Sequence, residues 1–572
     1  MKESFYMSNN VVVLDFSSEY FQNVQELVSS NGFKVFIERY FKDLAINDIN
    51  MFSWLTNNRS LDEMVKDVVK LTKSLLVLDV DDIFNNEYDQ INRIKALYIV
   101  ENAYNFWRRK QRFSYINVST NKLSFTSFME LDSKFNQLVL NLYRSCEEKL
   151  QGYSNKVYRQ LQAGTNASFV VKKYRFQLAN KYSFLKNVLF VNTVMLRTPI
   201  IFHSESNKRV GTFQQLQQFP INPASFSSQN WFCYPCFVGK LLCYVYFHRD
   251  YCPSGIFLSN LFEMATEQQC ANRKCDLICF FGNPDAKKDC GFYYDNENDI
   301  YIADIKADYK IEYFGYIKKA ILTVHNLMML NRGKLPIHGS MINILFRNGL
   351  KKSVVFVGDS GAGKSETIET VKKISNQQIS DHTISKIEIV FDDMGCLFEK
   401  EGSIYANGTE TGAFVRLDDL DKLTAYRDLE RNIFINPQKE NARVIQPVSS
   451  YDLITADHKV DMVLYANNYQ NEVGIKHFTD YKQAIECFKQ GKRIAKNTTQ
   501  ETGLTSTYFA NPFGPMQMQQ QCDPIIERMF KKMIADGIFV GEIYTNLATD
   551  NPNGIVESAS ELLQMLKGDK NK

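Results

Sequence analysis

An apolar run, Ser353-Val-Val-Phe-Val357, leads directly into Gly358-Asp-Ser-Gly-Ala-Gly-Lys364-Ser365. The run predicts a buried strand, and residues 366–373 predict a helix, so the segment satisfies G-x-x-x-x-G-K-[ST] in a strand–loop–helix context. Glycines let backbone N–H groups face phosphate oxygens, and the helix N-terminus adds a favourable field. The alternative is a glycine-rich turn that binds nothing. We expect a nucleotide-binding P-loop that contacts phosphate through Gly358, Ser360, Gly361, Gly363, Lys364 and Ser365.

Two acidic residues downstream are candidates to hold the cation of a bound nucleotide. In the P-loop itself, Lys364 supplies charge to the β- and γ-phosphates, and Ser365 offers its hydroxyl to Mg²⁺. A second expected strand, Ile387–Phe391, ends in Asp392-Asp393. Carboxylates at a strand end beside a phosphate loop can hold the cation directly or through water. Such a pair taken alone is typical of a turn, so it is the nearby P-loop that indicates a metal site.

Composition excludes several classes of protein. A chain of 572 residues predicts two to four domains, and its net charge of +3 gives no electrostatic signature for nucleic acid. No apolar run approaches the roughly 20 residues of a membrane helix. The opening MKESFYMSNN is too polar for a signal or transit peptide. We expect a soluble, cytoplasmic protein with no nucleic-acid or membrane partner.

The texture of the sequence changes twice along the chain. Residues 1–160 show helical periodicity, with a capping box at Ser60-Leu-Asp-Glu63. Residues 161–310 carry short aromatic and β-branched runs separated by turn residues, which predicts a β-rich domain. Helices and strands alternate in 311–572, where the P-loop lies. The overall class is therefore α/β (α+β overall).

The cysteines are unevenly distributed. Eight of the 12 lie between Cys233 and Cys290, and Cys233-Tyr-Pro-Cys236 has the spacing of zinc ligands. Cys270, Cys275 and Cys279 are the residues that would complete such a site, but they form no second C-x-x-C pair. Because free cysteines are commonly buried as small apolar residues, we favour core cysteines over zinc.

Several blocks resemble the phosphoenolpyruvate carboxykinase and HPr kinase superfamily, in order and over about 311–550. They are Tyr313–Lys319, Leu335–Ser340, the GDSGAGKSET segment, Phe391–Gly395, Thr409–Gly412, Glu440–Val444, Gly503–Thr505 and Phe513-Gly514. The resemblance is nearest to ATP-type carboxykinases. It implies a two-lobed fold with a β-rich N-terminal lobe, a P-loop C-terminal lobe and a helical N-terminal extension.

The resemblance also implies a set of site residues. Lys319, His338 and Asp393 take the positions of the carboxykinase Mn²⁺ ligands, while Mg²⁺ accompanies ATP at Ser365, backed by Asp392. Lysine ligates a metal only as a neutral amine, so its pKa must be strongly depressed. The remaining matched positions are Arg416 as a cation near the transferred phosphoryl group, Thr505 on the nucleotide side, and Tyr313, Lys318 and Arg197 on the substrate side.

Each of these assignments has a plainer alternative. Lys319 alone reads as a surface charge, His338 as a core histidine, Tyr313 as a core tyrosine and Arg197 as a strand-end arginine. The clustering of titratable groups around a P-loop favours the site.

Three departures from the carboxykinase pattern keep other functions open. The P-loop ends Lys-Ser-Glu, Lys476 stands where an arginine contacts substrate, and Thr502 stands where an arginine contacts nucleotide. Our leading expectation is ATP-dependent decarboxylation and phosphorylation of oxaloacetate to phosphoenolpyruvate. The second is an HPr-kinase-like hydroxyl kinase with Asp359 as general base. The third is a non-catalytic nucleotide-binding scaffold.

Overall fold

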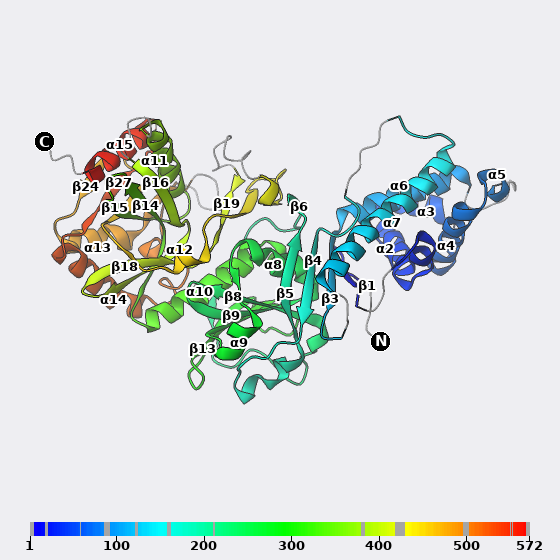
Figure 1. The fold of residues 1–572 in the computed structure, drawn as a ribbon, viewed down its shortest axis with the longest axis horizontal. Helices are drawn as coiled ribbons and strands as arrows, with labels where there is room; N and C mark the ends of the chain where they lie inside the picture. The colour runs from blue at the N-terminus through cyan, green and yellow to red at the C-terminus, as the bar shows by residue number, and fades with distance from the viewer. Residues whose placement is uncertain are drawn as a thin grey trace. The chain divides into compact units, whose positions relative to one another are not determined.

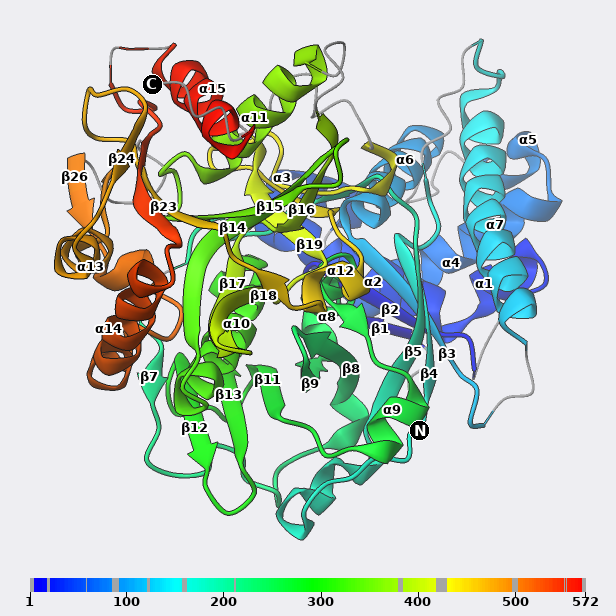
Figure 2. The ribbon, with the colours of Figure 1, turned by 60° about the vertical axis from the view of Figure 1, so that its left-hand side comes forward.

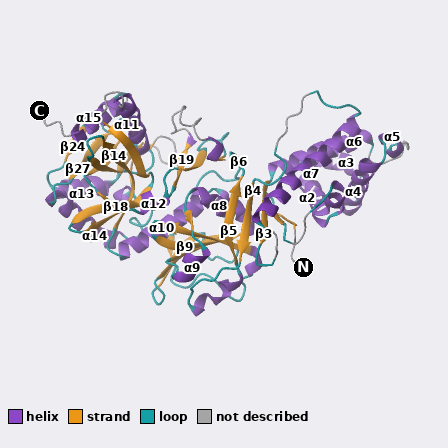
Figure 3. Ribbon diagram, viewed as in Figure 1, coloured by secondary structure: helices purple, strands orange, loops and turns teal. Residues whose placement is uncertain are grey.

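The computed structural model describes residues 5–17, 21–57, 59–84, 92–120, 124–156, 162–209, 212–378, 384–417, 429–495, 503–549, 551 and 553–567. The chain is a mixed α/β protein with several mixed sheets (Figures 1 and 3). It divides into unit 1, Met1–Lys173 with Leu189–Arg197, and unit 2, Tyr174–Val188 with Thr198–Lys572. Among the helices of the described ranges, none is long and apolar enough to cross a bilayer.

Unit 1 combines helices with a sheet in the order β1-β2-β3-β4-β5. Its strands are β1 (Phe5–Met7), β2 (Val11–Asp15), β3 (Gln111–Asn117), β4 (Ala167–Lys172) and β5 (Leu189–Leu196). Its helices are α1 (Val24–Ser29), α2 (Asn31–Asn47), α3 (Ile49–Thr56), α4 (Leu61–Val77), α5 (Val80–Ile83), α6 (Arg93–Arg109) and α7 (Phe125–Gln151). The region expected to be helical therefore also contains β1–β3. The expected capping box at the start of α4 is confirmed, because Glu63 N donates to Ser60 Oγ and Ser60 N donates to the Glu63 carboxylate.

The core of unit 1 contains a cavity. Apolar side chains from β2, α2, α4, α6 and α7 surround a space of about 120 Å³.

The first part of unit 2 is rich in strands, in the order β8-β9-β11-β13-β12-β7 with β10 on the edge of β8. The strands are β7 (Gln214–Gln215), β8 (Trp231–Val238), β9 (Leu241–His248), β10 (Glu263–Met264), β11 (Leu277–Asn283), β12 (Cys290–Asp295) and β13 (Ile300–Lys306). The helices α8 (Cys252–Phe257), α9 (Glu267–Asn272) and α10 (Gly315–Asn331) accompany them. The region expected to be β-rich and the P-loop region lie mostly together in this unit.

The cysteines of this sheet are core residues. All eight between Cys233 and Cys290 are buried free thiols, as the core interpretation predicts. Cys236 on β8 lies directly opposite Cys243 on β9. Burial raises the pKa of Cys243, Cys275 and Cys279 well above the ordinary value, so these three thiols stay protonated and chemically inert.

The second large sheet of unit 2 carries the P-loop. Its order is β22-β18-β17-β14-β15-β23-β27-β24, with β16 also paired to β14. The strands are β14 (Leu335–Phe346), β15 (Lys351–Val357), β16 (Ile384–Phe391), β17 (Met394–Lys400), β18 (Ser403–Gly408), β22 (His458–Lys459), β23 (Met462–Asn467), β24 (Ile475–His477) and β27 (Phe539–Tyr544). Strands β15, β23 and β27 are parallel, so their carboxyl ends meet at one edge.

Alternating side chains of β15 explain how this sheet is covered on both faces. Val354 and Phe356 pack with α11 (Lys364–Gln378) and α15 (Gly554–Lys567). Val355 and Val357 pack with α13 (Tyr481–Gln490) and α14 (Gln519–Ala535). Figure 2 shows α11 and α15 on one side of the sheet and α13 and α14 on the other.

Three smaller pieces complete unit 2. A sheet in the order β19-β21-β20-β6 joins segments that are far apart in sequence, and a hairpin joins β25 to β26. Their bounds are β6 (Ile200–Phe202), β19 (Gly412–Arg416), β20 (Ile433–Ile435), β21 (Arg443–Pro447), β25 (Lys492–Ala495) and β26 (Gly503–Ser506), and the short helix α12 (Tyr451–Thr455) precedes β22.

Candidate functional site

The P-loop lies between β15 and α11, where the sequence predicts it. Gly361 and Gly363 have φ of +80° and +104°, a conformation that other residues rarely adopt. A Cβ atom on Gly363 would also come within 2.6 Å of the Thr545 side chain. Two residues after neighbouring strands hold the loop from outside: Asn468 Nδ2 donates to Gly361 O at 3.0 Å, and Thr545 Oγ1 donates to Ala362 O at 2.8 Å.

The two functional side chains of the P-loop are oriented by the loop and by Asp392. Lys364 Nζ donates to Gly358 O at 2.7 Å and to Asp359 O at 3.1 Å, so the ammonium lies inside the turn. Ser365 Oγ donates to Asp392 Oδ1 at 3.1 Å. Burial raises the pKa of Asp392 to about 6. This is the Ser–Asp pair expected to hold a nucleotide's cation.

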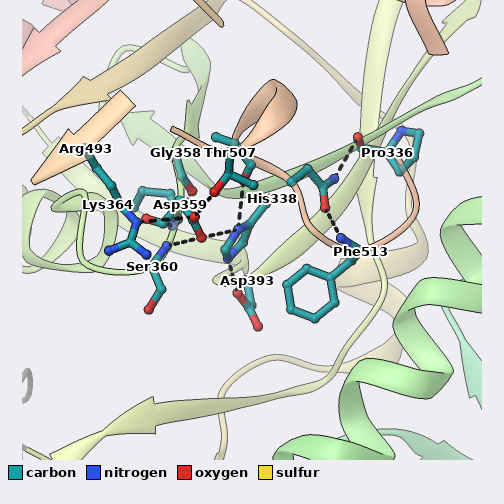
Figure 4. Close-up of polar contacts among 12 residues, drawn as sticks. Pro336, His338, Gly358, Asp359, Ser360, Lys364, Asp393, Arg493, Thr507 and Phe513 are labelled. Carbon is teal, nitrogen blue, oxygen red and sulfur yellow. Dashed lines mark hydrogen bonds and ion pairs between the residues drawn. The ribbon is translucent and has the colours of Figure 1, made fainter. Parts of the chain in front are cut away.

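His338 presents both of its ring nitrogens to oxygen acceptors. Nδ1 lies 3.0 Å from Ala510 O, and Nε2 lies 3.0 Å from Asp393 Oδ1 (Figure 4). A neutral imidazole carries only one N–H, so it cannot donate to both oxygens. With the proton on Nε2 the ring donates to Asp393, whereas with the proton on Nδ1 the Nε2 lone pair is free to bind a cation together with the carboxylate. This arrangement suits a divalent ion bound by His338 and Asp393.

Asp393 is held by a second buried cation. Lys318 on α10 forms an ion pair with Asp393 and a further one with Glu410 at 3.2 Å. Burial opposes its charge, but the two carboxylates outweigh that effect and raise the pKa of Lys318. Burial and the nearby Asp393 charge raise the pKa of Glu410 to about 8. Lys318, expected on the substrate side, therefore lies against the carboxylate that would hold the metal.

Lys319 has a different environment from its neighbour. Burial, helped by the positive charge of Arg209, lowers the pKa of Lys319 to about 7. Its Nζ lies 5.0 Å from the centre of the Phe513 ring, which in turn lies 5.4 Å from the His338 ring. A large share of the Lys319 side chains is thus neutral near pH 7, as a nitrogen ligand must be.

His338 and Asp393 lie in contact and could hold a divalent metal, whereas the described contact of Lys319 is with the Phe513 ring. Over the ranges that the structure covers, no three His, Cys, Asp or Glu side chains converge to hold an ion. His338, Asp393 and the neutral amine of Lys319 supply a mixed nitrogen and oxygen set, which suits Mn²⁺ better than Mg²⁺. Ser365 and Asp392 supply oxygens, which suit Mg²⁺.

Asp359 is engaged on both carboxylate oxygens. Ser360 N donates to Oδ1 at 2.7 Å, Thr507 Oγ1 donates to Oδ2 at 2.9 Å, and Arg493 Nε lies 3.3 Å from Oδ2 (Figure 4). Burial acts to raise its pKa, but His338 and Arg493 outweigh burial and lower the pKa of Asp359. A carboxylate this well solvated by donors is a weak base.

The other expected residues lie at different distances from the group formed by His338, Asp359 and Asp393. Thr505 on β26 is paired in register with Arg493, the partner of Asp359. Arg416 lies two residues after Phe414 on β19, so the two share a face of the strand. The Phe414 ring lies 5.7 Å from Lys318 Nζ and 5.8 Å from the Tyr313 ring, which is buried.

Two expected positions lie elsewhere or outside the described ranges. Arg197 directly follows β5 in unit 1, where it forms an ion pair with Asp132 and donates to Thr165 Oγ1 at 3.1 Å. Arg197 is therefore placed as the strand-end arginine that was the alternative to a substrate-side role. Thr502 lies outside the described residues.

Sequence reasoning missed several residues of the site. Asn468 and Thr545 each follow a buried strand, the same signal that identified Asp392, and could have been found by it. Arg493 gives no local signal, because only the β25–β26 hairpin brings it to Asp359. Arg209 likewise precedes no recognisable motif.

No protein-family model and no curated protein sequence matches this chain.

Proposed function

We propose that unit 2 is an ATP- and divalent-metal-dependent enzyme of the phosphoenolpyruvate carboxykinase type, which converts oxaloacetate to phosphoenolpyruvate. The observation that carries the proposal is the contact between His338 Nε2 and Asp393 Oδ1 at 3.0 Å, with the other ring nitrogen already facing a carbonyl. A histidine nitrogen and a carboxylate oxygen at this spacing beside a phosphate-binding loop can serve as adjacent ligands of one cation at the place where phosphate charge must be neutralised.

The low pKa of Lys319 supports the carboxykinase type in particular. An ordinary lysine is charged at pH 7 and repels metal ions, whereas the pKa of this one is about 7. The β-rich part and the P-loop part of unit 2 also agree with the two-lobed arrangement that the motif resemblance implies.

In the proposed reaction, the bond from C3 of oxaloacetate to its carboxylate breaks, and CO₂ leaves. The electron pair forms an enolate, whose oxygen takes the γ-phosphoryl group of ATP and leaves ADP. The P-loop N–H groups and Lys364 hold the phosphates, and phosphate oxygens replace the Gly358 and Asp359 carbonyls as acceptors for Lys364. Lys318 keeps Asp393 ionised and in place.

The metals would supply charge neutralisation for the phosphates and the enolate. His338, Asp393 and Lys319 would hold one ion, and Ser365 with Asp392 the other. Arg416, on the Phe414 face of β19, is the further cation that we assign to the transferred phosphoryl group.

A hydroxyl kinase is the second candidate, favoured by the position of Asp359 within 3.4 Å of His338. It needs a free base with an elevated pKa. Both oxygens of Asp359 are engaged and its pKa is lowered, which favours the carboxykinase reaction instead.

The test is the formation of phosphoenolpyruvate from oxaloacetate and ATP with Mn²⁺ and Mg²⁺. We expect Lys319→Ala to lower the rate by about 100-fold or more, because the change removes a metal ligand. Lys306→Ala removes an exposed lysine of β13 and serves as the matched control, with an expected rate within about twofold of the parent.

Calorimetry with ATP and Mg²⁺ on the same variants separates the alternatives. Unchanged ATP binding in Lys319→Ala together with lost turnover supports the proposal. ATP binding without turnover in the parent protein indicates a scaffold, and phosphate transferred to a serine-bearing acceptor indicates a kinase. Either result overturns the carboxykinase assignment.

A further inference from the structure

The cavity in the core of unit 1 has the properties of a small-molecule site. It measures about 120 Å³, is only partly enclosed, and is lined by residues of β2, α1, α2, α4, α6 and α7, together with Phe5, Phe16, Phe21 and Ser30. Figure 1 shows α2, α4, α6 and α7 in one group of helices. Ala103 on α6 is a small residue of the lining.

Four polar side chains that line the cavity use their hydrogen bonds elsewhere. Trp107 Nε1 donates to Ala163 O at 2.6 Å, and Tyr143 Oη donates to Glu101 Oε1 at 2.9 Å. The hydroxyls of Ser30 and Thr72 each donate at 2.7 Å to a carbonyl of their own chain segment, Leu27 O and Val68 O respectively. A buried water needs two to four polar partners, and these four side chains already have theirs. The cavity therefore favours an apolar occupant over water.

The lining is also strongly aromatic. Phenylalanine, tyrosine and tryptophan rings come from β1, α2, α6 and α7 and from Phe16 and Phe21, and several of them meet edge to face. The Phe36 ring stands at 88° to that of Trp107 with centroids 5.5 Å apart, and Phe16 stands at 64° to Phe135 at 5.8 Å. Such walls present both ring faces and ring edges, which suits another aromatic ring.

Among the described residues that line the cavity, none is an Asp, Glu, Lys or Arg. Glu101 accepts the Tyr143 hydroxyl at the α6–α7 side of the cavity, and burial raises the pKa of Glu101. The thiol of Cys146, on the lining, stays protonated because burial raises its pKa to about 12. An uncharged ligand avoids the desolvation cost that a carboxylate would meet against these walls.

We propose that unit 1 binds a small uncharged aromatic compound, of one or two fused rings, in this cavity. An engineered protein cavity of about 150 Å³ with leucine, isoleucine and phenylalanine walls stays dry and binds benzene, so the volume here is of the right order for one ring. Slight movement of the partly exposed rings at Phe33 and Phe36 gives room for a fused pair. The inference is independent of the reaction assigned to unit 2.

The experiment titrates the full-length protein with benzene, indole and octanoate by calorimetry. We expect saturable binding of benzene or indole with one site per chain, and binding of octanoate at least tenfold weaker. Trp107 lines the cavity, so bound bromobenzene should quench tryptophan fluorescence, and Trp107→Phe should remove most of that quenching. Octanoate binding more tightly than both ring compounds, or no saturable binding of either ring, overturns the proposal.

Ala103→Leu tests the location of the site. The added side chain fills part of the cavity, so we expect at least a tenfold loss of indole affinity with a melting temperature equal to or above that of the parent. Ala45→Leu makes the same change on α2 at a position that does not line the cavity, and should keep the parent affinity. If Ala103→Leu lowers the melting temperature instead, the Trp107→Phe variant is used to locate the site. Loss of the bromobenzene quenching of tryptophan fluorescence in that variant, with its fold unchanged, places the ligand in the cavity. Retained affinity in a folded Ala103→Leu protein places the ligand elsewhere and contradicts the inference.

Discussion

Two consecutive lysines of α10 show how neighbouring residues acquire opposite chemistry. Lys318 points to Asp393 and Glu410, whose charges raise its pKa. Lys319 lies on another side of the helix, where burial dominates and Arg209 adds repulsion, so its pKa falls to about 7. Successive helical residues are separated by about 100° around the axis, which lets one serve as a fixed cation and the other as a neutral amine.

This difference predicts how activity depends on pH. Protonated Lys319 cannot offer a lone pair to a metal, so the rate of phosphoenolpyruvate formation should fall as the pH drops through about 7 and level off above it. Competition by the metal for the amine moves the midpoint to lower pH as Mn²⁺ concentration rises. Rates measured between pH 5.5 and 9 at two Mn²⁺ concentrations check this. A midpoint that does not respond to Mn²⁺ would contradict the assignment of Lys319 as a ligand.

Strand β13 of unit 2 carries a buried carboxyl group, Asp304, that has no part in the proposed chemistry. Asp304 on β13 is 3% exposed, and Asn283 on β11 donates to it at 2.8 Å. Burial raises its pKa to about 7 from an ordinary value of 3.8, because the hydrogen bond does not replace the water that the carboxylate loses. The β13 strand is thus more stable in the fold when this group is protonated.

We expect the stability of the protein to decline with rising pH because of Asp304. The folded form binds the proton more tightly than the unfolded chain, so this stabilisation is complete below about pH 4 and is lost as the pH rises through about 7. A difference of that size corresponds to about 4 kcal/mol as an upper figure. Asp304→Asn keeps an acceptor for Asn283 and should flatten the dependence between pH 4 and 8 in urea unfolding. The exposed Asp289→Asn change is the control and should leave the slope unchanged.

Among the helices and strands, those whose sequence carries a local pattern were predicted correctly. The strand before the P-loop, the helix after it, and the strand before Asp392 are all present as β15, α11 and β16. The run Val11–Leu14 was included in a helical region because a short buried apolar run has no periodicity, and it is instead the fully buried strand β2. The β19-β21-β20-β6 sheet pairs Ile433 with Ile200, a contact that no local pattern encodes.

The candidate site divides in the same way. His338, Asp393 and the P-loop residues were found because each follows or lies within a recognisable local motif. Arg493 and Glu410 were not, because their roles come from distant partners, Asp359 and Lys318, brought to them by tertiary packing. A polar residue directly after a buried strand is the one sequence signal that would have added Asn468 and Thr545.

For the whole molecule, the two proposals assign a different ligand to each unit. ATP is expected at the end of β15 in unit 2, and an aromatic compound among α2, α6 and α7 in unit 1. Each unit has its own hydrophobic core, so each ligand should stabilise the hydrogen bonds nearest to it.

Hydrogen exchange on the full-length chain can therefore examine both ligands in one protein. ATP with Mg²⁺ should slow exchange of the amides of the P-loop, 358–365, and of the first turn of α11, because phosphate oxygens accept hydrogen bonds from these N–H groups. Indole should slow exchange in α6 and α7, because filling the cavity removes the local openings that an empty space permits. Adenosine, which lacks phosphates, controls for the first effect, and the Ala103→Leu variant controls for the second. Protection of α6 by ATP without protection of the P-loop would contradict the nucleotide site, whereas protection by indole confined to unit 2 would contradict the cavity site.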